Sequence, residues 1–341
     1  MSALILLAEC LQAEVKYNKI TSRRSRGILS GKSRLKCLER ASLRERPLGL
    51  DQLTPKNLHN SVSQKTEIKP GGLGLLSTLS EARRYKELFF FLFWRDISVR
   101  YKQTIFGVLW IIVTPLMSAG LFTLIRLMLG RDTGTEKGPE VFIIVLCGMV
   151  PWAFFSKSLS RASSSLTGSS ALITKVYFPR IIIPLASALA GLVDFAIGML
   201  IVIAFLIYGA FLPASGINPG WQILLFAPFV VLSFILAVSI GLFFGAVNVR
   251  YRDANVILGY LMSMGMHASA VWWPLAKIPE KYRLLVACNP FVGMMEGFRW
   301  SLVGGKFPAI PLLITLAFTL VMMVAGYKYF MKVERTFADV I

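Results

Sequence analysis

The chain has 341 residues, of which 55% are hydrophobic and only 16% are charged, and its mean hydropathy is +0.63. Few soluble domains are so apolar, and several stretches have the ~20 apolar residues that a bilayer core of ~30 Å requires, so the predicted fold class is an all-α polytopic membrane protein. The net charge of +19 is also consistent with basic residues on cytoplasmic segments, so we expect no nucleic-acid partner.

Residues 1–75 differ from the rest of the chain. They contain 14 Lys or Arg residues against 6 Asp or Glu, with scattered Ser, Gly and Pro and little periodicity. This composition predicts a basic, largely disordered cytoplasmic extension. The extension contains GILSGKS at 27–33, but a phosphate-binding loop needs four residues between its first glycine and Gly-Lys-Ser, and here there are three. We therefore expect no nucleotide site and no enzyme activity in this chain.

Residues 76–104 are predicted to form an interfacial helix followed by a charged connector. Thr78 and Glu81 make a capping box, which predicts a helix start. The apolar residues that follow recur at helical spacing and would form one stripe, made of Tyr85, Leu88, Phe89, Leu92 and Phe93. Such a helix can lie in the membrane interface.

The connector, WRDISVRYK, joins aromatic residues to charges directly before a long apolar run. Arg95, Arg100 and Lys102 could reach anionic headgroups, each worth ~1 kcal/mol near such a surface. Asp96 could pair with one of them or with a partner protein, and Trp94 and Tyr101 suit the water interface. Simple anchoring without motion is the alternative to a moving interface or gate helix.

Residues 105–341 are predicted to form a six-helix transmembrane domain. The expected spans are 106–129, 141–159, 181–208, 221–247, 255–275 and 310–331. Basic residues dominate the N-terminal segment and residues 160–180, whereas loop 209–220 has no charge, which places both termini in the cytoplasm. Residues 276–309 are basic yet would lie outside, and their apolar stretches are too short to span; we expect re-entrant or interfacial helices on the outer face.

Few residues suggest chemistry within the spans. The four cysteines have no CxxC spacing, and the two histidines lie far apart, so no metal site is expected. Asp194 lies deep in the third span, where an acid costs ~2.5–3.5 kcal/mol on insertion scales, so it should face protein or water. A packing hydrogen bond and a substrate contact are equally consistent with it.

Five segments, in order, resemble those of a known family. They are WRDISVRYKQTIFGVLWIIVTPL, PWAFFSKSLSRASSSLTGSSALITKVYFPR, NVRYRDANVIL, CNPFVGMMEGFRWSL and GYKYFMKVERTFADVI. Together they resemble the membrane (permease) subunit of type-2 ATP-binding-cassette exporters, above all the branch for polysaccharide and O-antigen export. Two departures are Ser169 and Ala171, where the family often has asparagine.

The resemblance implies a mechanism. Two copies of the chain would form the pathway in the bacterial cytoplasmic (inner) membrane, and two separate cytoplasmic subunits would bind ATP and Mg. ATP hydrolysis would drive a lipid-linked glycan outward. An exporter of the same fold for another glycan, a teichoic-acid-like polymer, a lipid or a drug-like cargo is the alternative.

The resemblance also implies site residues. Residues 161–176 would be a coupling helix seated in a groove of the ATPase, with the loop between spans 4 and 5 beside it; an ordinary loop and a local salt bridge are the alternatives. The candidate coupling residues are Arg161, Ser165, Gly168, Ser169, Lys175, Arg252 and Asp253. Aromatic side chains could line a glycan path or belong to interface belts. The candidates are Trp110, Trp152, Phe154, Phe155, Tyr260, Trp272 and Trp273.

Two other classes of protein fit less well. A membrane-embedded transferase would need converging acid and base groups, but neither Asp194 nor Glu296 has an evident partner in the sequence. A proton-driven secondary transporter would usually show more intramembrane carboxylates and inverted repeats.

Overall fold

The computed structural model describes residues 85–102, 107–128, 138–175, 178–211, 220–251 and 253–334. All of them belong to the second of two compact units, Gly71–Ile341, and within these ranges the chain forms helices and turns without a strand. The all-α fold class is therefore confirmed for this part of the chain. The predictions for residues 1–75, for GILSGKS and for the capping box of Thr78 and Glu81 lie outside the described residues.

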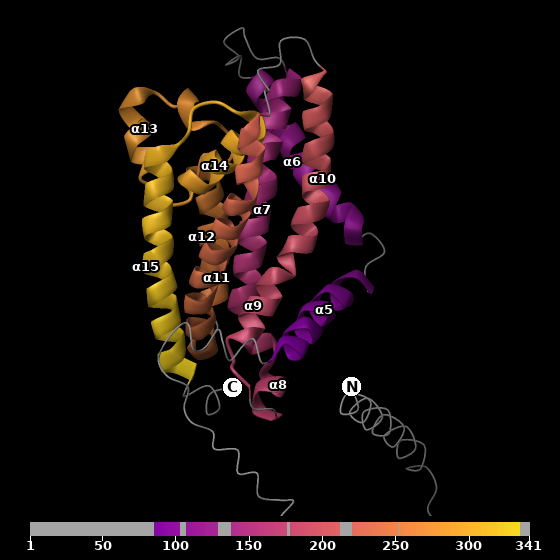
Figure 1. The fold of residues 1–341 in the computed structure, drawn as a ribbon, viewed down its shortest axis with the longest axis vertical. Coiled ribbons are helices and arrows are strands. Elements are labelled where there is room, and N and C mark those ends of the chain that lie inside the picture. Colours follow the sequence, from indigo (N-terminus) through magenta and orange to yellow (C-terminus); the bar gives the residue numbers. More distant parts are fainter. Residues whose placement is uncertain are drawn as a thin grey trace, which may run out of the picture. The chain divides into compact units, whose positions relative to one another are not determined.

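The helices follow one another with short connections. Their bounds are α5 Lys86–Lys102, α6 Gly107–Met128, α7 Gly138–Gly168, α8 Ser170–Lys175, α9 Ile182–Leu189, α10 Gly191–Ala210, α11 Phe226–Arg250, α12 Ala254–Ala268, α13 Glu280–Ala287, α14 Val292–Val303 and α15 Ala309–Glu334, with short 3-10 turns at Trp221–Leu225 and Leu275–Lys277. In Figure 1, α7, α11 and α15 run along the unit, and α5 crosses obliquely near the end at which α8 lies.

Four of the helical stretches are long and apolar enough to cross a membrane. They are Pro139–Gly168, Ile182–Ala210, Trp221–Arg250 and Ala309–Glu334, and they cover the predicted spans 2, 3, 4 and 6 to within one residue. The first predicted span coincides with α6, whose apolar stretch Leu109–Ile125 is shorter. The fifth coincides with α12, which has only 15 residues. Among the described residues, the structure thus supports four spans by length and composition.

The predicted end of span 5 near residue 275 is wrong. Helix α12 stops at Ala268, and Ala270 has a positive φ of 54°. A β-carbon makes this left-handed conformation uncommon, so the turn needs support from its surroundings. The support comes from Arg299, whose side chain donates hydrogen bonds to the carbonyls of Ala270 and Val271.

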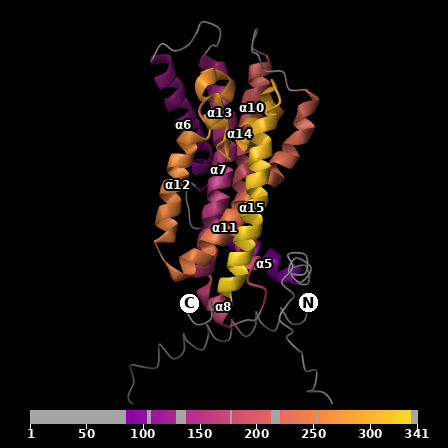
Figure 2. The same cartoon turned by 90° about the vertical axis from the view of Figure 1, so that its left-hand side faces the viewer.

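Residues 276–309 contain the two short helices α13 and α14, in line with the prediction of short helices there. Figures 1 and 2 both show α13 at the end of the unit opposite to α8. Helix α14 is buried over nearly its whole length, whereas Leu284 and Leu285 of α13 are exposed. Whether either helix is re-entrant or interfacial stays a prediction.

Helix α7 lies at the centre of the packing and contacts α6, α9, α10, α11, α12 and α14. Small residues let its neighbours approach closely. A Cβ placed on Gly241 of α11 would lie 2.4 Å from the Cβ of Ala162 on α7, and one on Gly326 of α15 would lie 2.3 Å from the carbonyl oxygen of Ser239 on α11. Close backbone approach of this kind is how membrane helices gain packing energy when lipid is as apolar as the side chains.

Candidate functional site

Helix α5 packs one face on the bundle and exposes the other. Leu92 is buried, and Leu88, Phe89 and Phe93 pack beside it against residues of α7, α9, α11 and α15. The predicted stripe is therefore confirmed for these four residues, as a contact with protein, whereas its first residue, Tyr85, is exposed. Phe90, Phe91 and Trp94 lie on the opposite face and are 57–62% exposed.

The charged connector expected after this helix is itself helical. Helix α5 continues without a break through WRDISVRYK to Lys102. The segment contains neither Gly nor Pro, so nothing in it interrupts the backbone hydrogen bonds. As a result its charged side chains leave a continuous helix at fixed angles, which brings several of them onto α9, α10 and the turn after α7.

Asp194 of α10 joins three helices through its carboxylate. Its Oδ2 accepts hydrogen bonds from Arg100 Nη1 of α5 at 2.6 Å and from Arg161 Nη2 of α7 at 2.7 Å. Its Oδ1 accepts one from the Tyr101 hydroxyl at 2.9 Å. The side chain is only 5% exposed. The expectation that Asp194 faces protein is confirmed, and the view that it has no partner is wrong, because its partners are remote in sequence.

The Tyr101 hydroxyl remains protonated in this site. Burial, and then its hydrogen bond to Asp194, raise the pKa of Tyr101 to about 12. A phenol is neutral at physiological pH even at its ordinary pKa of about 10, and the raised pKa of Tyr101 keeps the donating form to still higher pH. Tyr101 therefore serves as a fixed donor to the carboxylate, and its ring occupies the junction between α5 and α10.

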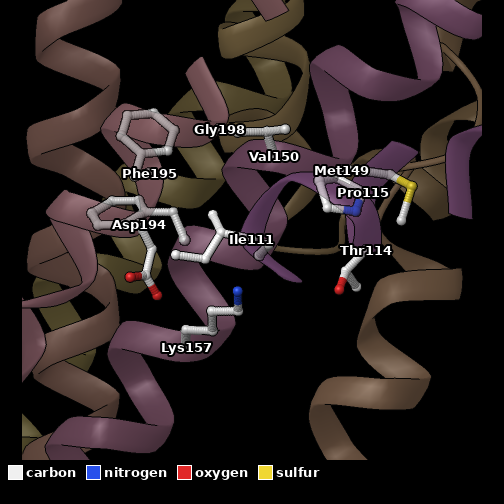
Figure 3. Close-up of a pocket in the computed structure, with 11 residues that line it drawn as sticks. Ile111, Thr114, Pro115, Met149, Val150, Lys157, Asp194, Phe195 and Gly198 are labelled. Carbon is white, nitrogen blue, oxygen red and sulfur yellow. The ribbon is translucent and has the colours of Figure 1, made fainter. Parts of the chain in front are cut away.

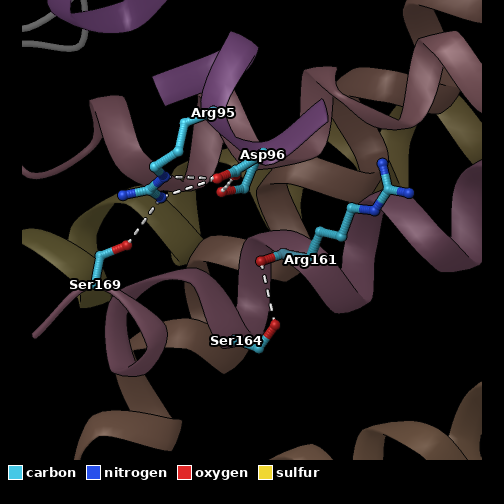
Figure 4. A network of polar contacts seen from close by, with 6 residues as sticks. Arg95, Asp96, Arg161, Ser164 and Ser169 are labelled. Carbon is cyan, nitrogen blue, oxygen red and sulfur yellow. Dashed lines mark hydrogen bonds and ion pairs between the residues drawn. The ribbon is translucent and has the colours of Figure 1, made fainter. Parts of the chain in front are cut away.

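A second carboxylate, Asp96, ties α5 to α9. Its Oδ1 accepts from Arg95 Nη2 at 2.9 Å, and its Oδ2 accepts from the Ser187 hydroxyl of α9 at 2.6 Å. Arg95 also reaches the Ser169 hydroxyl at 3.4 Å, at the turn between α7 and α8. Figure 4 shows this chain of contacts. Of the two predicted partners of Asp96, a neighbouring basic residue is confirmed.

The segment 161–176 does not form a separate element from its start. Helix α7 runs unbroken to Gly168, beyond the predicted end of span 2 near 159. Its hydroxyl side chains bond back to the helix itself: Ser164 to the carbonyl of Ser160, Ser165 to that of Ala162 and Thr167 to that of Ser164. Such back-bonding satisfies the polar groups without ending the helix.

The small residues of this segment divide between two environments. Ser163 is buried and donates to Asn255 Oδ1 of α12 at 2.7 Å, and Ser165 and Ser169 are also buried within the chain. Ser164 and Gly168 are exposed. A Cβ on Gly168 would meet nothing within 4 Å. The surface left for a partner is thus the Ser164–Gly168 side of α7, which Figure 4 shows facing away from α5 at Ser164.

The remaining candidate coupling residues are partly visible. Arg161 forms an ion pair with Asp194. Asp253 is exposed at the start of α12, where its carbonyl accepts from the amides of Val256 and Ile257. Arg252 and the side chain of Lys175 lie outside the described part of the chain. The coupling role of all these residues stays a prediction.

The aromatic candidates fall into two sets. Trp152, Phe154, Phe155 and Trp272 are at most 8% exposed and pack in the core, where the rings of Trp152 and Phe155 lie 5.5 Å apart. The aromatic rings of these four residues therefore contribute to the packing of the core. Trp110, Tyr260 and Trp273 are 41–70% exposed on the single chain. A pathway role for any of the seven rings stays a prediction.

The sequence interpretation missed a second buried ion pair, between Glu296 and Arg299 of α14. Arg299 is 5% exposed and also holds the carbonyls of Ala270 and Val271, while Glu296 accepts from the amide of Leu275 at 3.0 Å. The earlier view that Glu296 lacks a partner is wrong. Its i,i+3 spacing from Arg299 was the available signal. All these bonds brace the α12–α13 connection.

Comparisons with known proteins agree with one another. Residues 87–303 match the family described as ABC-2 type transporter. The O-antigen export system permease protein RfbA of Myxococcus xanthus is 25% identical over 269 residues, which are 78% of this chain and 99% of that protein. RfbA of Klebsiella pneumoniae is 25% identical over 72% of this chain and 92% of its own length. The polysialic acid transport protein KpsM of Escherichia coli has the same identity and the same coverages.

Proposed function

Because this chain belongs to the ABC-2 type transporter family, we propose that it is the permease subunit of an ATP-driven exporter that moves a lipid-linked polysaccharide, an O-antigen-like glycan, across the bacterial cytoplasmic membrane. One observation carries the proposal. The relatives aligned over 72% of the chain or more are named for O-antigen export or polysialic acid transport. A second support is the set of four long apolar helices, as a membrane protein requires.

In the proposed assembly, two copies of this chain form the pathway and two copies of a separate ATP-binding subunit dock from the cytoplasm. That subunit supplies the ATP and Mg sites. The docking surface on this chain is the exposed Ser164–Gly168 side of α7, with the turn to α8 and the start of α12 at Asp253 beside it. Ser164, Gly168 and Asp253 are exposed, and the Ser163–Asn255 hydrogen bond joins the end of α7 to the start of α12.

The two carboxylates give a route from this surface to α5. Asp96, through Arg95, connects α5 to Ser169 beside the docking surface. Asp194 connects α5 to Arg161 of α7. Arg161 lies less than two helical turns before Gly168, the last residue of α7. A displacement of the end of α7 would therefore be passed to α5 through charged contacts, and α5 would act as the gate at the membrane surface.

The direct test is export by the reconstituted assembly. We expect vesicles containing this chain and its ATP-binding subunit to move a lipid-linked glycan only when ATP is present. The chain alone should hydrolyse no ATP, and Lys32→Ala in the GILSGKS sequence should leave the activity of the assembly unchanged. ATP turnover by the isolated chain that disappears in Lys32→Ala would contradict this assignment.

The proposed topology has six spans and both termini in the cytoplasm. In this arrangement loops 130–140 and 209–220 face outward. We expect single cysteines introduced at residues 135 and 215, in a chain without its native cysteines, to react with a membrane-impermeant maleimide in intact cells. Cysteines placed at the exposed Ser164 should react only after the membrane is opened. Protection of both outer positions in intact cells would refute the six-span arrangement.

A further inference from the structure

A small cavity of about 90 Å³ lies between α6, α7 and α10, just above the Asp194 contacts. Figure 3 shows its lining. The walls are mainly apolar, with Ile111 of α6, Met149 and Val150 of α7 and Gly198 of α10, and the polar groups at its edge include Lys157 and Asp194. The cavity has room for a few water molecules or one compact group. A polysaccharide segment would not fit.

Lys157 brings a positive charge to this cavity. Its side chain is half-buried and points in among the lining residues (Figure 3). Within the described part of the chain it has no hydrogen bond or ion pair. A cation in an apolar, membrane-embedded setting is costly and usually marks a functional contact.

The nearest acid, Asp194, attracts the Lys157 ammonium but is shared with other donors. Both oxygens of Asp194 already accept from Arg100, Arg161 and Tyr101. Three cationic side chains from α5 and α7 therefore surround one carboxylate, which leaves the cavity with an excess of positive charge.

We propose that this cavity binds the phosphate group of an anionic lipid, with Lys157 as its counter-ion. A phosphate oxygen would accept charged hydrogen bonds from the Lys157 ammonium, which are stronger than neutral ones. Its compact size suits the available volume, and the apolar walls suit the first methylene groups of a lipid chain. The inference rests on the proposed function, in which such a phosphate would join the glycan to its lipid. It adds to that function a place where the head of the cargo is held.

Binding of defined lipids tests the proposal. The full chain, with its ATP-binding subunit, would be placed in neutral phosphatidylcholine nanodiscs and titrated with phosphatidic acid or with diacylglycerol, which lacks the phosphate. We expect native mass spectrometry to show a site with at least about tenfold preference for phosphatidic acid, the effect of one charged hydrogen bond. Lys157→Met should abolish the preference, and Lys157→Arg should largely retain it.

Two further variants separate the cavity from general surface charge. Ala153→Leu narrows the cavity without changing charge and should weaken phosphatidic acid binding, because Ala153 lines its wall. Lys306→Met removes an exposed lysine between α14 and α15 and should leave binding unchanged. An unaltered preference in Lys157→Met, or an equal loss in Lys306→Met, overturns the proposal.

The source of the phosphate is tested by competition. Inorganic diphosphate should compete poorly, because it lacks the apolar part; displacement of phosphatidic acid by equimolar diphosphate would mean that the site takes free phosphate and would overturn the lipid assignment. The binding assay involves no transport. A Lys157-dependent lipid site in an assembly that exports no glycan would therefore contradict only the proposed function, whereas glycan export with no such site would contradict only this inference.

Discussion

Replacing Asp194 by alanine is expected to lower the free energy of unfolding by about 3 kcal/mol, toward the lower end of the ~3–5 kcal/mol seen when one partner of a buried ion pair is removed. The loss arises because Arg161, with 21% of its side chain exposed, and the Tyr101 hydroxyl would be left without their acceptor. Arg100 is 40% exposed and can regain hydration, which limits the effect. Thermal unfolding in detergent, followed by tryptophan fluorescence, measures the change.

Matched variants identify the cause of this loss. Asp194→Leu combined with Arg161→Met should recover part of the stability, since removing both partners leaves no buried charge unpaired. Glu280→Ala removes an acid that is 93% exposed and should shift stability by no more than about 0.5 kcal/mol. If Asp194→Ala unfolds at the same temperature as Glu280→Ala, the three-helix junction does not contribute as argued.

The parts of the fold that the sequence predicted are those with a local signal. The stripe of α5 follows from apolar residues at helical spacing, and Leu92 at its centre is the most deeply buried residue of that helix. The four long spans follow from length and apolarity alone. In each case the residues that carry the pattern are near neighbours in sequence, so periodicity was enough to place them.

The features that the sequence did not predict depend on contacts between segments that are remote in the chain. Asp194 lies 33 residues from Arg161 and 94 from Arg100, and no spacing rule connects them. The end of α12 depends on Arg299, which holds the carbonyls of Ala270 and Val271 from 28 or 29 residues away. A prediction from hydropathy extends the span through residues 269–275, because these residues are apolar. Hydropathy does not account for a buried guanidinium that stabilises an open turn.

The small residues after span 2 show how one pattern can serve two purposes. A run of serines predicted a surface that could approach a partner closely, and Ser164 and Gly168 are indeed exposed. Ser163 and Ser165 face inward, where Ser163 bonds to Asn255 and the nearby Gly245 lets α11 approach α7. Composition could not divide the two sets, because the division follows from the angle at which each residue leaves a continuous helix.

The second large effect is expected at Gly168, where substitution by glutamate should uncouple ATP hydrolysis from export. Gly168 is exposed, and a Cβ there meets nothing within 4 Å, so the side chain of Gly168→Glu encounters no clash within this chain. Insertion and assembly of the permease should therefore be normal. A defect would come from the docked ATP-binding subunit, where an unpaired charge in a buried interface is costly.

We expect Gly168→Glu to weaken binding of the ATP-binding subunit by about 2 kcal/mol or more, which is at least roughly 30-fold, and to stop export while any remaining ATP turnover continues. Gly168→Ala is the matched control: it adds only the Cβ, and export should persist. Pull-down of the ATP-binding subunit and export in vesicles give the two readouts. If Gly168→Glu binds that subunit and exports normally, the exposed end of α7 is not the docking surface. Because the loop at Arg252 and Asp253 then remains as the other candidate contact, the same glutamate test would move to the start of α12.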